Sequence, residues 1–501
     1  MTAERSQAGG ADPPLPAGFR IELDPDTRQL TEAILFGGSP ARAMKLSAAG
    51  CRALGELRAG PVRSAAAGVL ARRLTDAGLA HPRPPAAPAP AAADVTVLIP
   101  VRDRAGMLDQ CLTALGRAYP VIVVDDGSAD PDGVAAVVAR HHAALVRRQA
   151  SGGPGMARND GLADIGSELV AFLDSDCAPP PGWIDRLAAH LADPLVGAVA
   201  PRVVGAPGGA CPQTAAGRYE EACGSLDLGP REARVVPGSR VAYVPTAALL
   251  VRRAALEAAA GGRPVFDAAL RYGEDVDLIW RMHDSGWRIR YEPAIRVAHR
   301  GPQSWADLLA RRFRYGTSGA PLARRHPGRL APLVLQPWPA LTVAAILARR
   351  PVAAAAAAAA GWLTLRNTVR SAGLPAGGVA AATATAVRQT GLGIGRYATQ
   401  FAAPALAVAL TARGRRVRAA ALSLLLAPAI DAYQRRKPGL DPVRFGLAHI
   451  ADDIAYGTGV WAGCARERTL APVTPLIAWR PLRVTSPGNL ERNAPDGQHL
   501  V

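Results

Sequence analysis

Apolar strands alternate with helical patterns between Val95 and about Leu309, and this alternation constrains the fold more than any other feature of the chain. The run VTVLIPV precedes a helical pattern at 107–115, and VIVVDD precedes a second one that leads to LVAFLDSD. Such alternation predicts a parallel sheet covered by helices, and ligands of these sheets bind at the carboxyl ends of the strands. We therefore predict an α/β domain over residues 94–325 with its site at that edge.

Changes of composition divide the rest of the 501-residue chain. Residues 1–15 are polar and rich in glycine and proline, which predicts a disordered tail. Short extended segments followed by two helical patterns predict a winged-helix-like module at 16–81. A semi-rigid proline–alanine linker at 82–93 is expected to carry few contacts between this module and the next domain. An alanine-rich helical region at 326–470 and a C-terminal tail at 471–501 complete the division.

The chain has 49% hydrophobic and 20% charged residues, which excludes a largely disordered protein. Its formal net charge is +17, and all but two of its basic residues are arginine. This bias is typical of a GC-rich genome, so codon usage explains part of the charge. The remainder suits a chain that meets phosphates, anionic lipid or nucleic acid, and composition does not choose among them. The six cysteines include no CxxC pair, and the N-terminus has no apolar run typical of a signal peptide. Both observations favour a reduced cytosolic location without export.

The strongest candidate site is Asp174-Ser175-Asp176, which directly follows an apolar strand. Two carboxylates at this spacing can hold a divalent cation that also binds a diphosphate, because Mg²⁺ and Mn²⁺ prefer oxygen ligands. Taken alone, the triplet is more typical of a turn or a capping pair, and the motifs around it favour the metal site. The preceding strand ends supply further polar residues, and a glycine-rich turn before Arg158 lacks the GK[ST] of a phosphate-binding loop. The candidate donor-binding residues are Pro100, Arg102, Asp103, Asp126, Arg158, Asp174 and Ser175.

A second acidic pair, Glu274-Asp275, precedes a helical pattern. The pair sits in the first turn, where the helix dipole stabilises a carboxylate, so capping and general-base catalysis are both consistent with it. His299 follows the next strand pattern, and we predict it as a third metal ligand beside Asp174 and Asp176. The residues predicted to contact acceptor or diphosphate are Glu274, Trp280, Arg281, Arg311, Arg312 and Arg314.

The order IPVRD, VDDGS, ARNDG, LDSD and GEDVDLIWR, with a later histidine, resembles the family 2 glycosyltransferases of the GT-A fold. The resemblance implies that a nucleotide sugar lies across the strand ends. It implies that Asp126 contacts uracil and that Asp174 and Asp176 bind ribose and a divalent cation, Mn²⁺ or Mg²⁺. It further implies that Asp275 is the base of an inverting transfer. Arg102-Asp103 departs from the aromatic or Asn-Glu pair of many relatives, which affects base recognition.

A resemblance over most of the chain is carried by GFRIELDPDTRQL, LFGGSPARAMKLSAAG and a WRPLRV segment near the C-terminus. These segments resemble the glycosyltransferases of the mycofactocin biosynthetic system. The resemblance implies transfer of glucose from UDP-glucose to premycofactocin, building a short β-1,4-glucan. The N-terminal module resembles winged-helix peptide-recognition elements, so we expect it to contact a biosynthetic partner, an intermediate or the chain's own catalytic domain.

Two other functions remain open from sequence: transfer to a membrane polysaccharide or lipid-linked sugar, and a non-catalytic scaffold that binds a sugar nucleotide. A nucleic-acid partner is not expected, since the module lacks a dense basic helix. Uncharged stretches at 330–348, 351–365 and 397–412 are at or below the ~20 residues that span a bilayer. A helical bundle on the membrane surface and true spans are both consistent with them. We expect the chain at the cytoplasmic face of the cell membrane, peripheral or integral, and otherwise in the cytoplasm.

Overall fold

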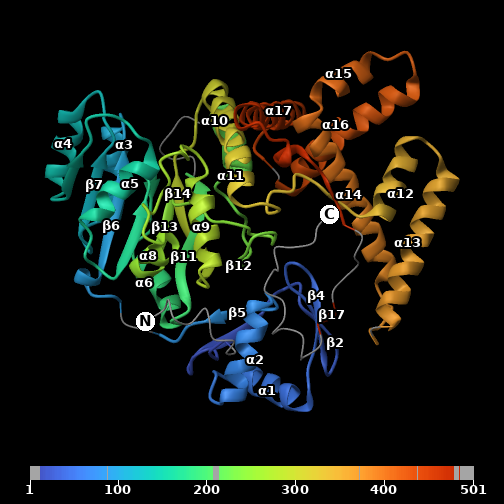
Figure 1. Cartoon of the computed structure of the whole chain (residues 1–501), viewed down its shortest axis with the longest axis horizontal. Coiled ribbons are helices and arrows are strands. Elements are labelled where there is room, and N and C mark those ends of the chain that lie inside the picture. Colours follow the sequence, from blue (N-terminus) through green and yellow to red (C-terminus); the bar gives the residue numbers. More distant parts are fainter. Residues whose placement is uncertain are drawn as a thin grey trace. The chain divides into compact units, whose positions relative to one another are not determined.

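The chain forms two compact units in a computed structural model (Figure 1). The first comprises Met1–Val204, Leu226–Arg300 and Leu482–Val501, and the second comprises Gly205–Ser225 and Gly301–Pro481. The structure describes residues 12–86, 89–206, 214–371, 373–436, 438–478 and 484–485.

A mixed sheet forms the centre of the first unit, in the order β10-β14-β11-β13-β9-β6-β7-β8, with β12 paired to β14. The four strands β6 to β9 are parallel, and β13 pairs antiparallel with β9. All seven residues of β6 are buried, as expected for a strand covered on both faces. The strands are β6 (Val95–Val101), β7 (Val121–Asp125), β8 (Ala144–Arg147), β9 (Leu169–Leu173), β10 (Cys177–Ala178), β11 (Val196–Gly205), β12 (Ala233–Val235), β13 (Ala248–Arg252) and β14 (Arg288–His299).

Helices cover this sheet, and their apolar faces share a core with its strands. Val97 and Ile99 of β6 and Val123 of β7 are fully buried in that core, together with Leu108 of α3. The α/β architecture predicted from the alternating pattern is therefore confirmed. The helices are α3 (Ala105–Leu115), α4 (Pro131–Arg140), α5 (Pro154–Ala163), α6 (Trp183–Ala188), α8 (Arg253–Ala260) and α9 (Glu274–Asp284).

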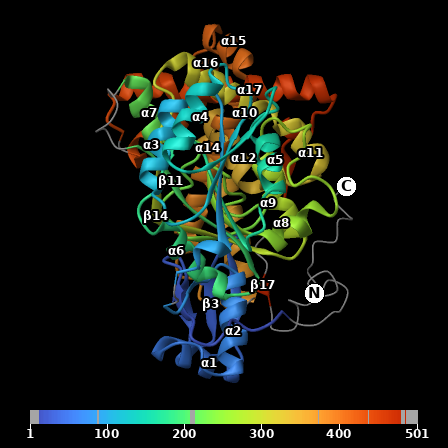
Figure 2. The ribbon, with the colours of Figure 1, turned by 90° about the vertical axis from the view of Figure 1, so that its left-hand side faces the viewer.

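The N-terminal module has two small sheets of short strands, one two-stranded and one four-stranded, and two helices around its own core (Figures 1 and 2). Ser47 and Ser64 cap the two helices by accepting hydrogen bonds from backbone N–H groups. Leu15 is buried in the module core, so the predicted tail at 1–15 ends earlier than expected. The elements are β1 (Arg20–Leu23), β2 (Arg28–Thr31), β3 (Ile34–Gly37), β4 (Arg42–Lys45), α1 (Ala48–Ala59), α2 (Ala65–Asp76) and β5 (Ala80–Arg83), and β17 (Val484–Thr485) pairs with β4.

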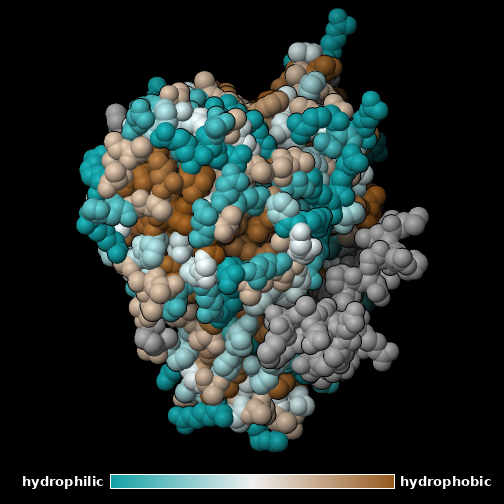
Figure 3. All heavy atoms as spheres, turned by 60° about the vertical axis from the view of Figure 1, so that its left-hand side comes forward, coloured by the Kyte–Doolittle hydropathy of each residue, from teal (hydrophilic) through white to brown (hydrophobic). Residues whose placement is uncertain are grey.

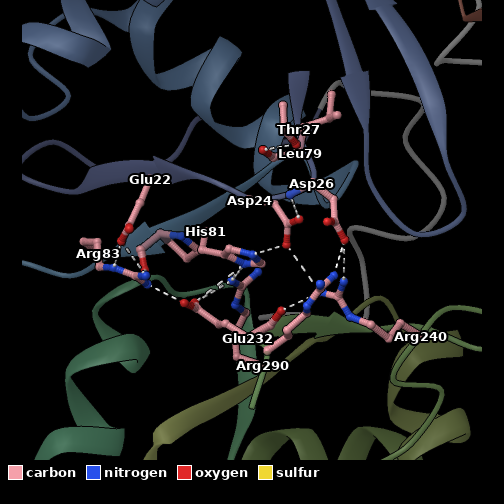
Figure 4. Close-up of polar contacts among 12 residues, drawn as sticks. Glu22, Asp24, Asp26, Thr27, Leu79, His81, Arg83, Glu232, Arg240 and Arg290 are labelled. Atoms are coloured by element: carbon pink, nitrogen blue, oxygen red, sulfur yellow. Dashed lines mark hydrogen bonds and ion pairs between the residues drawn. The ribbon is translucent and has the colours of Figure 1, made fainter. Parts of the chain in front are cut away.

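Ion pairs join the module to the part of the chain that forms the mixed sheet, which contradicts the expectation that few contacts link them. Arg72 of α2 binds Asp193, with both side chains almost fully buried and an N–O distance of 2.6 Å. Arg288 of β14 binds Asp76 of α2, again at 2.6 Å. Figure 4 shows a neighbouring network in which His81 of β5 lies beside Asp24 and Glu232. The structure therefore shows that one contact of the module is the chain's own catalytic domain.

The second unit is helical, as predicted for the alanine-rich region. Its helices α10 and α17 approach closely because Gly459 faces α10, where a Cβ would lie 2.0 Å from the Phe313 carbonyl oxygen. The predicted catalytic domain reached residue 325, whereas α10 and α11 belong to this unit. The helices are α7 (Ala215–Cys223), α10 (Trp305–Thr317), α11 (Gly319–Arg325), α12 (Pro337–Leu347), α13 (Pro351–Ser371), α14 (Val379–Phe401), α15 (Ala403–Thr411), α16 (Arg415–Arg436) and α17 (Pro442–Glu467), beside the short strands β15 (Val334–Leu335) and β16 (Leu476–Ile477). Within the described residues, no helix combines the length and apolar character needed to cross a membrane.

Candidate active site

An open pocket of about 530 Å³ lies at the carboxyl ends of β6, β7 and β9. Parallel strands bring their carboxyl ends to one edge, which explains why residues far apart in sequence meet here. Every predicted donor-binding residue except Arg158 lines this pocket, and so does Asp176. The lining residues are Pro100, Val101, Arg102, Asp103, Arg104, Asp126, Ser151, Gly153, Pro154, Asp174, Ser175, Asp176, Arg271 and Tyr272.

Asp126 holds the glycine-rich turn that begins α5. Its carboxylate accepts hydrogen bonds from the backbone N–H groups of Gly152 and Gly153, at 2.9 and 2.8 Å, and from the Ser151 hydroxyl at 2.8 Å. It also pairs with Arg148 at 3.0 Å. The carboxylate therefore shapes the pocket wall, and its predicted contact with uracil stays a prediction.

Arg158 is placed differently from the prediction. Its side chain is 2% exposed and does not line the pocket, so the structure does not place it as a direct donor contact. The guanidinium instead bridges two acids: it donates to Asp174 at 2.7 Å and to Glu274 at 3.2 Å. Helix α5 can approach α9 this closely because Gly155 faces Glu274, whose Cγ would lie 3.3 Å from an added Cβ. The buried guanidinium of Arg158 thus connects Asp174, which follows β9, to the start of α9.

The three predicted metal ligands are only partly assembled. Cys177 pairs with His299 between β10 and β14, and this register brings His299 Nε2 within 3.6 Å of Asp176 Oδ1. The other oxygen of Asp176 accepts a hydrogen bond from Arg104 at 2.6 Å, while Asp174 faces Arg158. No group of three His, Cys, Asp or Glu side chains that could hold a metal occurs in the described part of the chain. Asp176 and His299 fit a divalent cation as a pair of donors, one oxygen and one nitrogen.

The acidic pair Glu274-Asp275 begins α9, directly after Gly273 in the left-handed conformation with φ 78°. Asp275 accepts a hydrogen bond from the N–H of Val276 at 2.8 Å. Burial raises the pKa of Asp275 above its usual value. Burial also raises the pKa of Glu274, to about 7, with a further contribution from the charge of Asp275. The pair can therefore bind or release a proton near neutral pH, as a general base requires.

Three of the predicted acceptor or diphosphate residues serve other contacts. Trp280 is 2% exposed and donates to the Ala242 carbonyl, so it is part of the core. Arg281 binds Asp277 and two backbone carbonyls. Arg312 is buried in the second unit between Glu220 and Asp452, at 3.0 and 2.7 Å. Each of these polar groups is thus bound within the protein, and the predicted contact of the three residues with acceptor or diphosphate stays a prediction.

The remaining members of that set have mixed outcomes. Glu274 faces Arg158, as described above. Arg311 and Arg314 lie on α10 of the second unit, and their predicted role stays a prediction. The sequence reasoning did not single out Arg104, Ser151, Arg271 and Tyr272, which line the pocket. Their proximity to the predicted motifs could have indicated them, since Arg104 follows Arg102-Asp103 and Tyr272 precedes Gly273 and the acidic pair.

Comparisons with known proteins agree with this architecture. Residues 96–258 match the model of the family described as glycosyl transferase family 2. The pre-mycofactocin glycosyltransferase of Mycobacterium tuberculosis, in strains CDC 1551 and H37Rv, is 39% identical over 494 residues, which is 92% of this chain and 98% of the relative. The chain belongs to glycosyltransferase family 2, among the pre-mycofactocin glycosyltransferases. Both the family and the GT-A fold predicted from the motifs are thus confirmed.

More distant proteins share only part of the chain. Glycosyltransferase AglE of Haloferax volcanii is 28% identical over 234 residues, which cover 44% of this chain and 71% of the relative. A solved mannosyltransferase of Pyrobaculum calidifontis, in complex with GDP-Man and Mn²⁺, is 20% identical and covers 68% of this chain and 87% of its own, with a TM-score of 0.36.

Proposed function

We propose that this glycosyltransferase transfers glucose from UDP-glucose to premycofactocin with inversion and builds a short β-1,4-glucan on it. The observation that carries the proposal is the 39% identity to a pre-mycofactocin glycosyltransferase over 98% of that relative. The pocket supports it, because the carboxylates that such a transfer needs line or adjoin one edge of the sheet.

In the proposed reaction, Asp275 accepts the proton of an acceptor hydroxyl as that oxygen attacks the anomeric carbon. The new C–O bond forms as the bond from the anomeric carbon to the diphosphate oxygen breaks, and UDP departs with both electrons. Arg158 binds Glu274 and offsets part of the negative charge around Asp275. Asp176 and His299 would hold a divalent cation, Mn²⁺ or Mg²⁺, which when bound offsets charge on the departing diphosphate.

The proposal is tested by incubating purified protein with a panel of nucleotide sugars and Mn²⁺, with and without premycofactocin. We expect UDP release to be fastest with UDP-glucose and to rise when premycofactocin is added. Mass spectrometry should find the acceptor heavier by whole hexose units. A different preferred donor would contradict the glucose assignment. No turnover with any donor would favour the scaffold alternative.

The metal assignment predicts unequal effects of removing its two ligands. Asp176→Ala should weaken Mn²⁺-dependent UDP binding more than His299→Ala, because a carboxylate contributes negative charge as well as a lone pair. Calorimetric titration of UDP with and without Mn²⁺ measures both. Asp164→Ala, an exposed aspartate at the end of α5, is the matched control. Unchanged affinity in the His299 variant would leave that histidine as a structural residue.

The raised pKa values predict the pH dependence of catalysis. A base must be ionised to act, so kcat/KM should rise with pH up to about neutrality, as the carboxyl pair loses its protons. Glu274→Gln removes a neighbouring negative charge and should therefore move this acid limb to lower pH. Rates measured between pH 5 and 9 with saturating donor test both statements. An acid limb that stays in place in this variant would show that Glu274 does not influence the base.

A further inference from the structure

The positive charge of the chain is concentrated in one segment. Residues 308–430 contain sixteen arginines and no aspartate or glutamate. The whole chain has 58 Lys and Arg against 41 Asp and Glu, so this segment accounts for all but one unit of the net charge of +17. Codon usage alone would spread arginine along the chain and would not remove every acid from this segment. Arg312, Arg324, Arg388 and Arg396 pair with acids outside the segment. The excess of positive charge that remains indicates a surface that meets the opposite charge.

The second unit, to which this segment belongs, also carries most of the exposed large apolar side chains. Among the described residues, Val69 is the one large exposed hydrophobic side chain outside Trp305–Ile477. Figure 3 shows hydrophobic (brown) and hydrophilic (teal) side chains next to each other on the part of the molecule that projects at the top of the view. Exposed apolar groups that gather in one part of a chain mark a place of contact.

The hairpin of α12 and α13 combines both features most clearly. Only Gly361 is buried among the 21 residues of α13, where it packs against Trp338 of α12. A helix that is apolar over most of its circumference is normally covered. The exposed fractions of large side chains here are 63% for Leu341, 54% for Ile346, 83% for Val352 and 48% for Leu363.

Arginines mark both ends of the apolar part of α13. Arg349 and Arg350 form the turn of the hairpin, and Arg366 and Arg370 lie in the last turns of α13. The guanidinium of Arg366 stacks 5.1 Å from the centre of the Trp362 ring. A tryptophan beside a cation, at the end of an apolar stretch, is an arrangement found at the boundary between lipid tails and headgroups.

We propose that the α12–α13 hairpin binds the surface of an anionic lipid membrane, with its exposed apolar side chains among the headgroups and its arginines at the phosphates. Charge complementarity selects this occupant. A symmetric contact with a second copy would bring the same acid-free surface together twice and oppose arginine to arginine. A nucleic acid would satisfy the arginines but would leave the apolar side chains in contact with a polar partner. The proposal is independent of the donor and acceptor.

The test is co-sedimentation of the full chain with vesicles of phosphatidylcholine alone or with added phosphatidylglycerol. We expect the apparent Kd to be about tenfold or more lower with the anionic vesicles at low salt, and high salt to release the protein. Arg349→Glu/Arg350→Glu and Leu341→Ser/Val352→Ser should each weaken this binding by about tenfold. The matched control Arg52→Glu/Arg117→Glu reverses two exposed arginines of the first unit and should change binding by less than about twofold. Thermal unfolding of each variant checks that the exposed substitutions leave the fold intact.

Four results would overturn the proposal. The first is equal binding to neutral and anionic vesicles, and the second is a hairpin variant that binds like wild type. Protein that resists high salt and is released only by detergent would mean insertion. Finally, a lipid-free dimer that the Leu341→Ser/Val352→Ser variant abolishes, with no vesicle binding by the wild type, would assign the surface to a second copy.

Discussion

Asp275→Asn is expected to lower kcat by about 10²–10⁴-fold while the Kd for UDP changes by no more than about threefold. The amide keeps the size of the side chain but accepts no proton from an acceptor hydroxyl. The proposed donor pocket lies at the ends of the strands, and Asp275 is not among the residues that line this pocket. Donor binding should therefore survive the substitution, while the chemical step should not.

The measurement separates a base from a structural cap. Steady-state turnover at saturating donor and acceptor gives kcat, and titration with UDP gives the Kd. Asp284→Asn, at the exposed opposite end of α9, is the matched control and should keep wild-type turnover. If Asp275→Asn retained more than about half of the wild-type kcat, another group would have to accept the proton. A parallel loss of UDP binding and thermal stability would mean that the aspartate mainly holds the helix start.

The sequence was sufficient to predict which carboxylates lie close together, because the order of parallel strands in the sheet determines their positions. Strands such as VTVLIPV and LVAFLDSD are almost wholly apolar, so they are readily predicted as buried parallel strands. Once strands are parallel, the residues after them lie at one edge. Asp126 and Asp174 therefore share a pocket although 48 positions separate them in the sequence.

The structure departs from the expectation at long polar side chains, whose direction no local pattern determines. Arg158 follows a glycine-rich turn, which suggested a phosphate contact, but its guanidinium points inward to Asp174 and Glu274. Arg312 belongs to a dense cationic run, yet it alone among Arg311, Arg312 and Arg314 is buried. The aliphatic part of an arginine side chain packs on apolar surface, and the direction of its guanidinium depends on acids that are distant in the sequence. Those partners become known only from the tertiary structure.

The docking of the N-terminal module on the catalytic domain was one of three contacts that the sequence left open. The proline-rich linker is a local feature, and it suggested two parts with few contacts between them. The contacts that oppose this view join residues more than a hundred positions apart, such as Arg72 and Asp193. Neither residue stands out in the sequence. The burial of this pair makes the module part of the folded catalytic unit.

We therefore expect Arg72→Met to lower the free energy of unfolding by about 3–5 kcal/mol, since it leaves the buried Asp193 carboxylate without its partner. The loss includes two hydrogen bonds from the guanidinium to the carboxylate, at 2.6 and 2.8 Å, and a third to the Pro13 carbonyl at 3.0 Å. Arg73→Met is the matched control, because Arg73 is the exposed neighbour on the same helix. The double variant Arg72→Met/Asp193→Leu should recover much of the loss, because no unpaired charge then stays buried.

Removal of the whole module extends the same argument. A chain that begins at residue 91 would leave Asp193 without Arg72, and Arg288 and Arg234 without Asp76. Burial raises the pKa of Asp76, but the hydrogen bond from Arg288 and the positive charges of Arg234, Arg288 and Arg72 together outweigh this effect. They hold the pKa below its usual value, so the pair is ionised at neutral pH. We expect the truncated chain to lose donor hydrolysis and acceptor transfer together, with a lower Tm or no soluble protein at all. A truncated chain that hydrolyses donor at the wild-type rate and loses only acceptor use would instead make the module a separate recognition domain, and the buried ion pairs would then contribute little to the stability of the sheet.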